Sequence, residues 1–242
     1  MQCVILAGGL GTRLGELTKT IPKNLIPVLG QPFAAHQLAW LSRCGVDSVV
    51  YSIGYKGEQI QEFVGDGSRF GLRVAWVSDG PVPLGTGGPL RASLDAGLLD
   101  ESFCVVYGDS YLPLDLGELY RAFLAQDCPA MMSVLRNQGR WGRSNAAFAD
   151  GRVTAYRKGP ARADDPELDS IDYGATVLKR EVLAALPAGP SAIETVYEEL
   201  SDGGRLGAYP VTERFYEVGS PAGLAELEAY LQVSSVPSSS KS

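Results

Sequence analysis

The stretch VILAGGLGTRLGELTKTIPKNLIPV, residues 4–28, decides the fold of this chain. It begins with three apolar residues, Val4–Leu6, and continues into a loop that holds three glycines within four positions, Gly8, Gly9 and Gly11. An apolar run followed by such a cluster predicts a buried strand, after which the backbone turns sharply and lets another group approach closely. The strand is therefore expected to end in a loop whose backbone N–H groups are uncovered.

Two cations, Arg13 and Lys23, follow on the same connection. Together with uncovered N–H groups they predict a positive concavity that binds phosphate. The Walker A pattern does not match, because no Gly-Lys-Ser or Gly-Lys-Thr follows the loop. The dinucleotide fingerprint does not match either, because Leu14 takes the place of its third glycine and no acidic residue lies between Glu16 and Asp47.

The stretch resembles the signature of the nucleoside-diphosphate-sugar pyrophosphorylases, Gly-Gly-x-Gly-Thr-Arg-Leu followed about ten residues later by Pro-Lys and Pro-Val. Residues 7–14 and 22–28 match it nearly residue for residue, and the visible departure is Glu16, where many members carry proline. The resemblance implies that Arg13 and Lys23 hold a nucleoside triphosphate as catalytic cations. It also implies nucleotide contacts along the loop, at Leu6, Ala7, Gly8, Gly9, Gly11 and Thr12. The alternative is a loop that only turns the chain, with two solvated cations.

The length and charge of the chain narrow its class. Its 242 residues are enough for one large α/β domain, which we expect over residues 1–232, with a disordered serine-rich tail at 233–242. The formal charge of −7 and the pI near 4.8 argue against a nucleic-acid partner and against attraction to anionic lipid. Any nucleotide must therefore be bound by local positive charge.

Cysteine spacing and hydropathy predict a cytoplasmic protein. The four cysteines show no Cys-x-x-Cys spacing and are expected to be small buried side chains in a reducing compartment. No stretch approaches the ~18 apolar residues needed to span a bilayer, and the start lacks the basic and apolar regions of a signal peptide. Whether the protein is a monomer or a homodimer stays open.

Alternating elements follow the opening loop. We expect helices over residues 32–43 and 56–64, and strands over 48–53 and 74–77. Strands separated by such helices predict right-handed crossovers and a parallel sheet, whose ligands lie at the carboxyl ends of the strands. His36, the single histidine, is expected to be a packed helix residue, because no Ser or Cys nucleophile motif accompanies it.

The second half of the chain departs from this alternation. Asp150-Gly151 is a preferred two-residue turn, and it predicts a hairpin between residues 146–149 and 152–156. The fold class is therefore α/β, a Rossmann-like three-layer αβα sandwich with a mostly parallel, mixed central sheet. Further expected strands lie at 103–107, 130–135 and 171–178, and further helices at 90–98, 116–125 and 221–232.

A second glycine cluster, Leu84–Gly88, follows the strand at 74–77 and belongs at the same edge of the sheet. Alone it is an ordinary glycine-rich turn. The resemblance implies that such a stretch contacts the nucleobase and ribose through its backbone. The nucleotide-binding residues that it adds are Gly85, Thr86, Gly87 and Gly88.

Asp109 follows the strand at 103–107 and is expected to hold Mg²⁺, because a carboxylate at a parallel strand end faces the polyphosphate loop and Mg²⁺ takes oxygen ligands. A turn-capping role is the alternative. The resemblance makes Asp109 the principal metal ligand. It also implies a second metal ligand at Glu217, since Glu217–Pro221 resembles the family's Asp-Ile-Gly-Thr-Pro segment, with coordination direct or through water.

Three segments are expected to hold the acceptor. The regular alternation breaks at Arg136–Asn145, which is typical of an acceptor-side loop. Arg157–Pro160 resembles the family's Glu-Lys-Pro, whose lysine contacts the sugar phosphate, and either Lys158 or Arg157 takes that role here. Residues 171–178 resemble the sugar-binding strand, with Asp and Tyr where relatives often carry Asn. The substrate-binding candidates are Asn145, Lys158, Tyr173 and Gly174.

The hypothesis for function is Mg²⁺-dependent transfer of a nucleotidyl group from a nucleoside triphosphate to a sugar 1-phosphate, with pyrophosphate as leaving group. Residues 53–58, 65–72 and 84–88 resemble the heptose and mannose 1-phosphate guanylyltransferase branch, which favours GTP slightly over UTP and dTTP. Two alternatives stay open. One is a cytidylyltransferase acting on a non-sugar phosphate or phosphonate, and the other is a catalytically silent nucleotide-sugar sensor.

Overall fold

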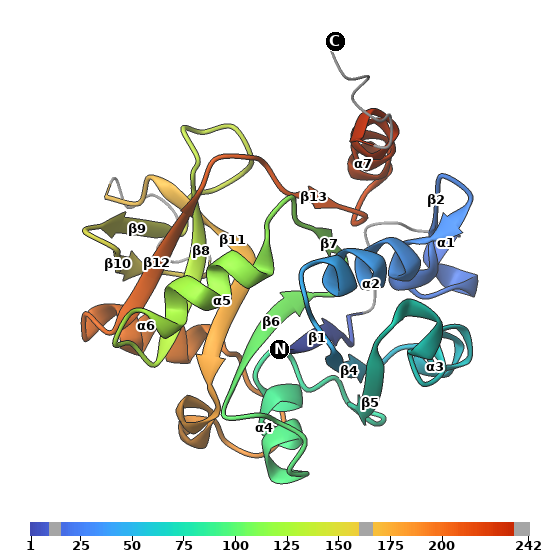
Figure 1. Ribbon diagram of the computed structural model, residues 1–242, viewed down its shortest axis with the longest axis horizontal. Coiled ribbons are helices and arrows are strands. Elements are labelled where there is room, and N and C mark those ends of the chain that lie inside the picture. Colours follow the sequence, from blue (N-terminus) through green and yellow to red (C-terminus); the bar gives the residue numbers. More distant parts are fainter. Residues whose placement is uncertain (10–15, 160–166, 235–242) are drawn as a thin grey trace.

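The computed structural model of the chain describes residues 1–9, 16–159 and 167–234. The candidates Gly11, Thr12 and Arg13, and the tail at 235–242, lie outside the described residues. Within the described part a nine-stranded sheet has the order β5-β4-β1-β6-β11-β8-β12-β10-β9. Figure 1 shows β4 and β5 on the right of the view and β9 and β10 on the left, with α2 and α5 in front of the sheet.

The amino-terminal half of the sheet is parallel, as the alternation of strands and helices predicts. Ile5 of β1 pairs with Tyr51 of β4 on one side and with Val106 of β6 on the other. All four carboxyl ends therefore meet at one edge of the sheet. Its strands are β1 (Gln2–Ala7), β4 (Ser48–Ile53), β5 (Arg73–Ser78) and β6 (Ser102–Tyr107).

The other half is mixed. β11 runs antiparallel to both β6 and β8, β8 and β12 are parallel, and β10 is antiparallel to β12 and β9. The predicted mixed α/β sheet is confirmed. Parallel pairing does not predominate in it, because β11 runs in the opposite direction to both of its neighbours, β6 and β8. These strands are β8 (Ala130–Arg136), β9 (Ala146–Ala149), β10 (Arg152–Tyr156), β11 (Ser170–Lys179) and β12 (Leu206–Val211).

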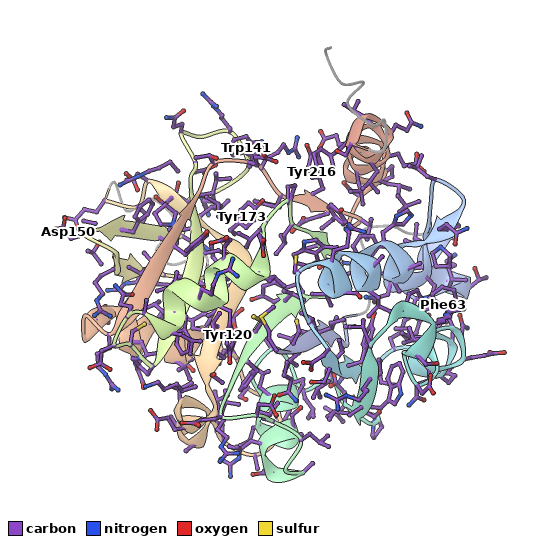
Figure 2. The ribbon with its side chains drawn as sticks, viewed as in Figure 1. Phe63, Tyr120, Trp141, Asp150, Tyr173 and Tyr216 are labelled. Carbon is purple, nitrogen blue, oxygen red and sulfur yellow. The ribbon has the colours of Figure 1, made fainter. Side chains whose placement is uncertain are left out.

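The predicted hairpin joins β9 to β10. Asp150 and Gly151 have φ of 48° and 72°, and two successive positive φ angles are what a type I′ turn requires. Asp150 lies at the outer edge of the molecule (Figure 2). Two smaller pairs stand apart from the main sheet: β2 (Pro27–Val28) with β3 (Gln31–Pro32), and β7 (Ser110–Tyr111) with β13 (Tyr216–Glu217).

Helices cover both faces of the sheet, because successive strand side chains point to opposite sides. Cys3 and Ile5 of β1 belong to one buried cluster, whereas Val4 belongs to the other. The first cluster contains residues of α2 (Phe33–Arg43), α3 (Gly57–Val64), α5 (Leu116–Leu124) and α7 (Pro221–Ser234). The second contains residues of α4 (Gly88–Asp95), α6 (Glu194–Asp202) and the 3₁₀ helix η5 (Arg180–Ala185).

The remaining short helices are α1 (Glu16–Thr20), η2 (Lys23–Leu25) and η3 (Ser68–Phe70). His36 lies on α2 as expected, and its Nε2 is 2.8 Å from the Val28 carbonyl oxygen, so it ties the helix to the segment before it. The helix expected at 221–232 runs on to Ser234. Among the described residues, none of the helices is long and apolar enough to cross a membrane.

The buried face of α2 generates a stability prediction. Leu38 is fully buried, whereas Leu124 at the end of α5 is 65% exposed. Leu38→Ala is expected to lower the free energy of unfolding by about 2–5 kcal/mol, through lost burial and the cavity left behind. Leu124→Ala is the matched control and should change it by no more than ~0.5 kcal/mol. Urea denaturation measures both, and similar midpoints for the two variants would contradict the packing described.

Candidate active site

A cavity of about 280 Å³ opens at the carboxyl edge of the parallel strands. Residues from the ends of β1, β4, β5 and β6 line it, together with the glycine-rich segment that leads into α4. The sequence predicted ligand binding at this edge, and the cavity lies there. Its lining includes Leu6, Ala7, Gly8, Gly9, Lys23, Asn24, Ser52, Asp79, Pro83, Gly85, Thr86, Pro89, Tyr107, Gly108 and Asp109.

Lys23 and Asp109 meet in this cavity. The Lys23 Nζ lies 2.6 Å from the Asp109 Oδ2, and the two side chains are 14% and 23% exposed. A charge pair that is largely shielded from water interacts more strongly than an exposed one. Two of the predicted catalytic residues, 86 positions apart, are therefore in direct contact.

Asn24 positions this pair. Its side chain is buried, and its Nδ2 donates to the carbonyl oxygen of Gly108, the residue before Asp109. Gly108 permits the contact, since a Cβ there would come within 2.6 Å of the Asn24 Nδ2 and 2.8 Å of the Ala7 Cβ. The end of β6 and the η2 turn are thus held together, and Lys23 reaches Asp109 as a consequence.

The first glycine loop lies against the end of β5. A Cβ on Gly8 would approach the Asp79 Oδ2 to 2.4 Å, so any other residue there would require the Asp79 carboxylate to shift. Gly9 is open instead, since a Cβ on it would meet no heavy atom of the described residues within 4 Å. Gly8 and Gly9 both line the cavity, and their contact with a nucleotide stays a prediction.

The second glycine cluster packs against a segment from the other half of the chain. Gly85 has φ of +75°, and a Cβ on it would lie 2.5 Å from the Ser191 carbonyl oxygen. A Cβ on Gly87 would lie 2.8 Å from the Ser191 Oγ, and one on Gly88 would lie 2.5 Å from the Gly189 carbonyl oxygen. These glycines therefore allow two backbones to approach closely, a role that the sequence did not suggest.

A second cavity of about 460 Å³ shares Gly85 and Thr86 with the first. Lys158 and Glu194 line it and form an ion pair there. Thr86 donates to the other oxygen of the Glu194 carboxylate and accepts from the Ile193 backbone at 3.1 Å. Glu194 therefore joins the second glycine cluster to Lys158, the predicted acceptor cation.

Arg157, the alternative acceptor cation, faces another partner. Its guanidinium lies 2.6 Å from the Asp202 Oδ1 and also donates to the Tyr156 carbonyl oxygen. Of the two candidates, Lys158 is the one that lines a cavity joined to the nucleotide loop.

Asp172 of β11 lies close to this pair. Burial raises the pKa of its carboxyl, and the donated Gly174 N–H and the positive charge of Lys158 oppose that rise. The negative charge of Asp172 in turn helps burial to raise the pKa of the Tyr107 hydroxyl. An acid, Asp172, and an aromatic ring, Tyr107, thus adjoin the Lys158 cation.

Tyr173 departs from the prediction of a substrate contact. Its ring is 1% exposed in the core, stacks edge-on against Phe215, and its hydroxyl donates to the Arg214 carbonyl oxygen at 3.3 Å. Figure 2 shows it in the interior beside β11. Neighbouring strand residues point to opposite faces, so Asp172 and not Tyr173 lies on the Lys158 side.

Gly174 and Asn145, the other two predicted substrate contacts, have structural roles in and beside β11. Gly174 has φ of +104° at an irregularity in the pairing of β11 with β8. The Asn145 Oδ1 accepts from the Asp172 backbone N–H at 2.8 Å, which fixes the loop to β11.

Glu217 comes next to Asp109 through backbone pairing. Glu217 of β13 pairs with Ser110 of β7, and the Val218 N–H donates to the Asp109 carbonyl oxygen at 2.9 Å. No group of three or more His, Cys, Asp or Glu side chains gathers as a metal cage within residues 1–9, 16–159 and 167–234. Of the two predicted ligands, Asp109 lines the cavity and Glu217 is not among its lining residues. One cavity carboxylate fits Mg²⁺, which usually takes one or two carboxylates and completes its shell with substrate phosphates and water.

The comparison with protein families decides the family of the chain. Residues 3–188 match the model of the MobA-like NTP transferase domain. The chain belongs to this family. The matched span of the NTP transferase domain contains both glycine loops, the Lys23–Asp109 pair and Lys158.

The curated relatives of the chain are also named as nucleotidyltransferases. The chain is 29% identical over 226 residues to a mannose-1-phosphate guanylyltransferase of Mycobacterium tuberculosis, covering 91% of this chain and 62% of the relative. It is 36% identical over 119 residues to a D-glycero-alpha-D-manno-heptose 1-phosphate guanylyltransferase of Campylobacter jejuni, covering 49% of this chain and 52% of the relative. The chain thus spans less than two thirds of the length of these curated relatives.

A solved structure matches over nearly the whole chain. HddC from Yersinia pseudotuberculosis, complexed with GMP-PN, aligns with a TM-score of 0.78 at 24% identity, covering 95% of this chain and 99% of that one. At this identity the likeness establishes the fold of the NTP transferase domain.

Sequence reasoning missed three residues of the site. Asn24 stands inside the quoted motif, and its place between Lys23 and the apolar Leu25 was the available signal. Asp79 follows a predicted strand, as Asp109 does, and the same strand-end argument applies to it. Glu194 carried no local signal, because its partners Thr86 and Lys158 are distant in sequence.

The Glu194 ion pair generates a pH-dependent prediction. Burial by itself raises the pKa of Glu194, but attraction to Lys158 and hydrogen bonds from Lys158 and Thr86 outweigh it, so its pKa lies below the ordinary value of 4.5. A lowered pKa stabilises the fold above the unfolded-state value and loses that contribution as the pH falls through the folded-state value. Glu194→Gln should therefore lower the free energy of unfolding by about 1–3 kcal/mol at pH 7.

The difference between Glu194→Gln and the wild type should shrink as the pH falls below 4.5. Denaturant titrations at several pH values measure it. The control is Glu118→Gln, which removes the Glu118–Arg121 pair of α5, where both side chains are more than half exposed, and which should change stability by under ~0.5 kcal/mol. Equal effects of the two substitutions, or a pH-independent difference, would contradict the role of Glu194.

Proposed function

We propose that the chain is a sugar-1-phosphate nucleotidyltransferase. A phosphate oxygen of the acceptor attacks the α-phosphorus of a nucleoside triphosphate, a new P–O bond forms, the bond to the β-phosphate oxygen breaks, and pyrophosphate leaves. The observation that carries this proposal is the Lys23–Asp109 pair, set in a cavity at the glycine loop and joined through Thr86 to a second cavity that holds Lys158. Membership of the NTP transferase family supports it.

The donor half of the site binds and neutralises phosphate. Lys23, which lines the cavity beside its partner Asp109, would bind the triphosphate, and the sequence motif assigns Arg13 the same task. Asp109 and Glu217 would hold Mg²⁺, which when bound neutralises charge on the phosphates. No general base is needed, because the acceptor phosphate is its own nucleophile, so the residues act by orienting the two substrates in line.

The acceptor half uses the second cavity. Lys158 binds the acceptor phosphate, since it lines this cavity and Arg157 does not, although each of the two cations has a carboxylate partner. Glu194 holds Lys158 in position, and Asp172 accepts hydrogen bonds from hydroxyl groups of the sugar. A hexose or heptose 1-phosphate has a phosphate group for Lys158 and hydroxyl groups for Asp172.

We also propose the domain organisation and the cellular location of the protein. A single domain over residues 1–232 accounts for both buried clusters, since they share one sheet. The substrates are small and water-soluble, which is consistent with a cytoplasmic location.

Alanine substitutions test the catalytic pair. Lys23→Ala and Asp109→Ala should each reduce kcat/KM at least tenfold, because each removes charge that acts on the triphosphate or its metal. Initial rates of pyrophosphate release measure this. Lys179→Ala is the control, because Lys179 pairs with Ser102 at the opposite edge of the sheet and should keep wild-type activity. Retention of more than a tenth of wild-type activity in either site variant would overturn the assignment.

The donor preference is tested by a matrix of nucleoside triphosphates against sugar 1-phosphates with Mg²⁺. GTP is expected to exceed UTP and dTTP, which is supported by the guanylyltransferase relatives and by the GMP-PN complex of HddC. A kcat/KM for UTP or dTTP more than tenfold above that for GTP, about 1.4 kcal/mol in transition-state binding, would reverse the preference and leave nucleotidyl transfer intact. A phosphocholine or phosphonate acceptor that exceeds every sugar 1-phosphate would overturn the acceptor assignment.

A further inference from the structure

Asp109 lies in the turn Tyr107–Ser110, the Asp109 turn, which leads from β6 into β7. Each of its four carbonyl oxygens accepts a hydrogen bond from another element. The Gln37 Nε2 donates to the first and the last of them, at 2.9 Å each. The Asn24 side chain and the Val218 N–H donate to the two between. Gln37, on α2, is therefore the residue that holds both ends of the turn.

The side chain of Gln37 is fixed in a packed helix. Gln37 is fully buried, and so are Phe33, Leu38 and Leu41 of the same helix, which belong to the first buried cluster. The amide nitrogen of Gln37 uses both of its hydrogens on the turn, because it bonds two carbonyl oxygens. Rotating the amide would bring its own oxygen against those two oxygens, so its orientation follows from these contacts.

The other end of this amide is left unpaired. The Gln37 Oε1 is buried without a hydrogen-bond partner in residues 1–9, 16–159 and 167–234. A buried acceptor without a partner destabilises a fold, and each such atom in a native structure needs an explanation. An apolar side chain of the same length would fill this place in the helix without an unpaired oxygen. What only the amide supplies is the pair of hydrogen bonds to the Asp109 turn.

The direction of the Asp109 carboxylate depends on the backbone of this turn. Its Oδ2 lies 2.6 Å from the Lys23 Nζ. Its Oδ1 has the Ser110 Oγ at 3.5 Å, which is longer than the roughly 2.5–3.0 Å of a good O–H···O hydrogen bond. In the proposed function Lys23 binds phosphate instead. The carboxylate is then aimed at the cavity by the backbone of its turn, whose ends Gln37 holds.

We infer that Gln37 is a positioning residue that aims Asp109 at the divalent cation, an inference that rests on the proposed function. Gln37 does not line the cavity, so it acts through the Asp109 turn and not by contact with substrate or metal. Mg²⁺ accepts only a narrow range of ligand distances and angles, so a small shift of the turn weakens its binding. Residues that hold a metal ligand in place typically contribute about 10- to 100-fold to metal affinity.

The test is a double-mutant cycle of Gln37→Met and Asp109→Ala in the full chain, with Mn²⁺ as a spectroscopic probe for Mg²⁺. Methionine keeps the length and the helix preference of the side chain but donates no hydrogen bond. Electron paramagnetic resonance measures the dissociation constant of Mn²⁺ with GTP, and in parallel with UTP, in the absence of acceptor. Gln37→Met should raise this constant about tenfold or more. In the Asp109→Ala background the same substitution should leave it unchanged, because the ligand that Gln37 positions is gone.

Ser133→Ala is the matched control. The Ser133 hydroxyl is fully buried and bonds two backbone groups of Ala175, the carbonyl oxygen at 2.6 Å and the N–H at 3.2 Å, and neither residue lines the two cavities of the site. Its substitution should lower the melting temperature, as Gln37→Met does, and leave the Mn²⁺ constant unchanged. The Mg²⁺ concentration that gives half of the maximal rate should rise about tenfold in Gln37→Met and stay constant in Ser133→Ala.

The opposite results overturn the inference. Additive effects of the two substitutions in the cycle would show that Gln37 does not act through Asp109. An unchanged Mn²⁺ constant in Gln37→Met, or a wild type that binds Mn²⁺ no more tightly than Asp109→Ala, would reject the role as well. If Gln37→Met does not fold, Gln37→Asn takes its place, since it keeps the amide but withdraws it by one methylene. Failure of both variants to melt cooperatively would make Gln37 a residue of the fold only.

The cycle also separates this inference from the proposed function. Weakened Mn²⁺ binding that depends on Asp109, without release of pyrophosphate from any pair of substrates, would overturn the proposed function and keep the role of Gln37. Release of pyrophosphate together with additive effects in the cycle would keep nucleotidyl transfer and reject the role of Gln37.

Discussion

The ion pair between Lys23 and Asp109 is the contact on which the site depends. It joins the connection after β1 to the end of β6, and it forms because Gly108 leaves room for Asn24 to reach the adjacent carbonyl oxygen. A cation and a carboxylate held together in a shielded cavity neutralise each other, and in the proposed function phosphate and metal would take the place of this pairing. The pair therefore holds an ammonium group and a carboxylate together at the carboxyl edge of the parallel strands.

Close backbone approach links this edge to the rest of the chain. Gly85, Gly87 and Gly88 lie against the segment that ends in Glu194, and Glu194 binds both Thr86 and Lys158. The two cavities share a wall as a result. One carboxylate, that of Glu194, thus links the second glycine cluster to Lys158. In the function proposed above, this arrangement would align donor and acceptor as in-line transfer requires.

Side chains that alternate between the two faces of a strand place core residues next to cavity residues in the sequence. On β11, Asp172 faces the Lys158 side, while its neighbour Tyr173 fills the core and binds the Arg214 carbonyl oxygen. On the parallel strands, Leu6 and Ser52 face the cavity side, while Ile5 and Tyr51 pack beneath α2 and α3. The same periodicity of two makes a site residue and a core residue adjacent in sequence, so a motif match locates a strand more readily than it identifies the functional side chain.

The sequence alone determined what local patterns can specify: the buried strand before Gly8 and Gly9, the alternation of the first half, the Asp150–Gly151 turn, Lys23 as a cation on the connection after the first strand, and Asp109 as a carboxylate just past a strand. Only the tertiary structure decided which distant groups meet. Glu194 lies 108 residues from Thr86, and the return of β11 between β6 and β8 makes half of the sheet mixed. The hydrogen bonds from Gln37 to the Asp109 turn likewise span 70 and 73 positions, and residue types and local spacing do not encode such distant contacts.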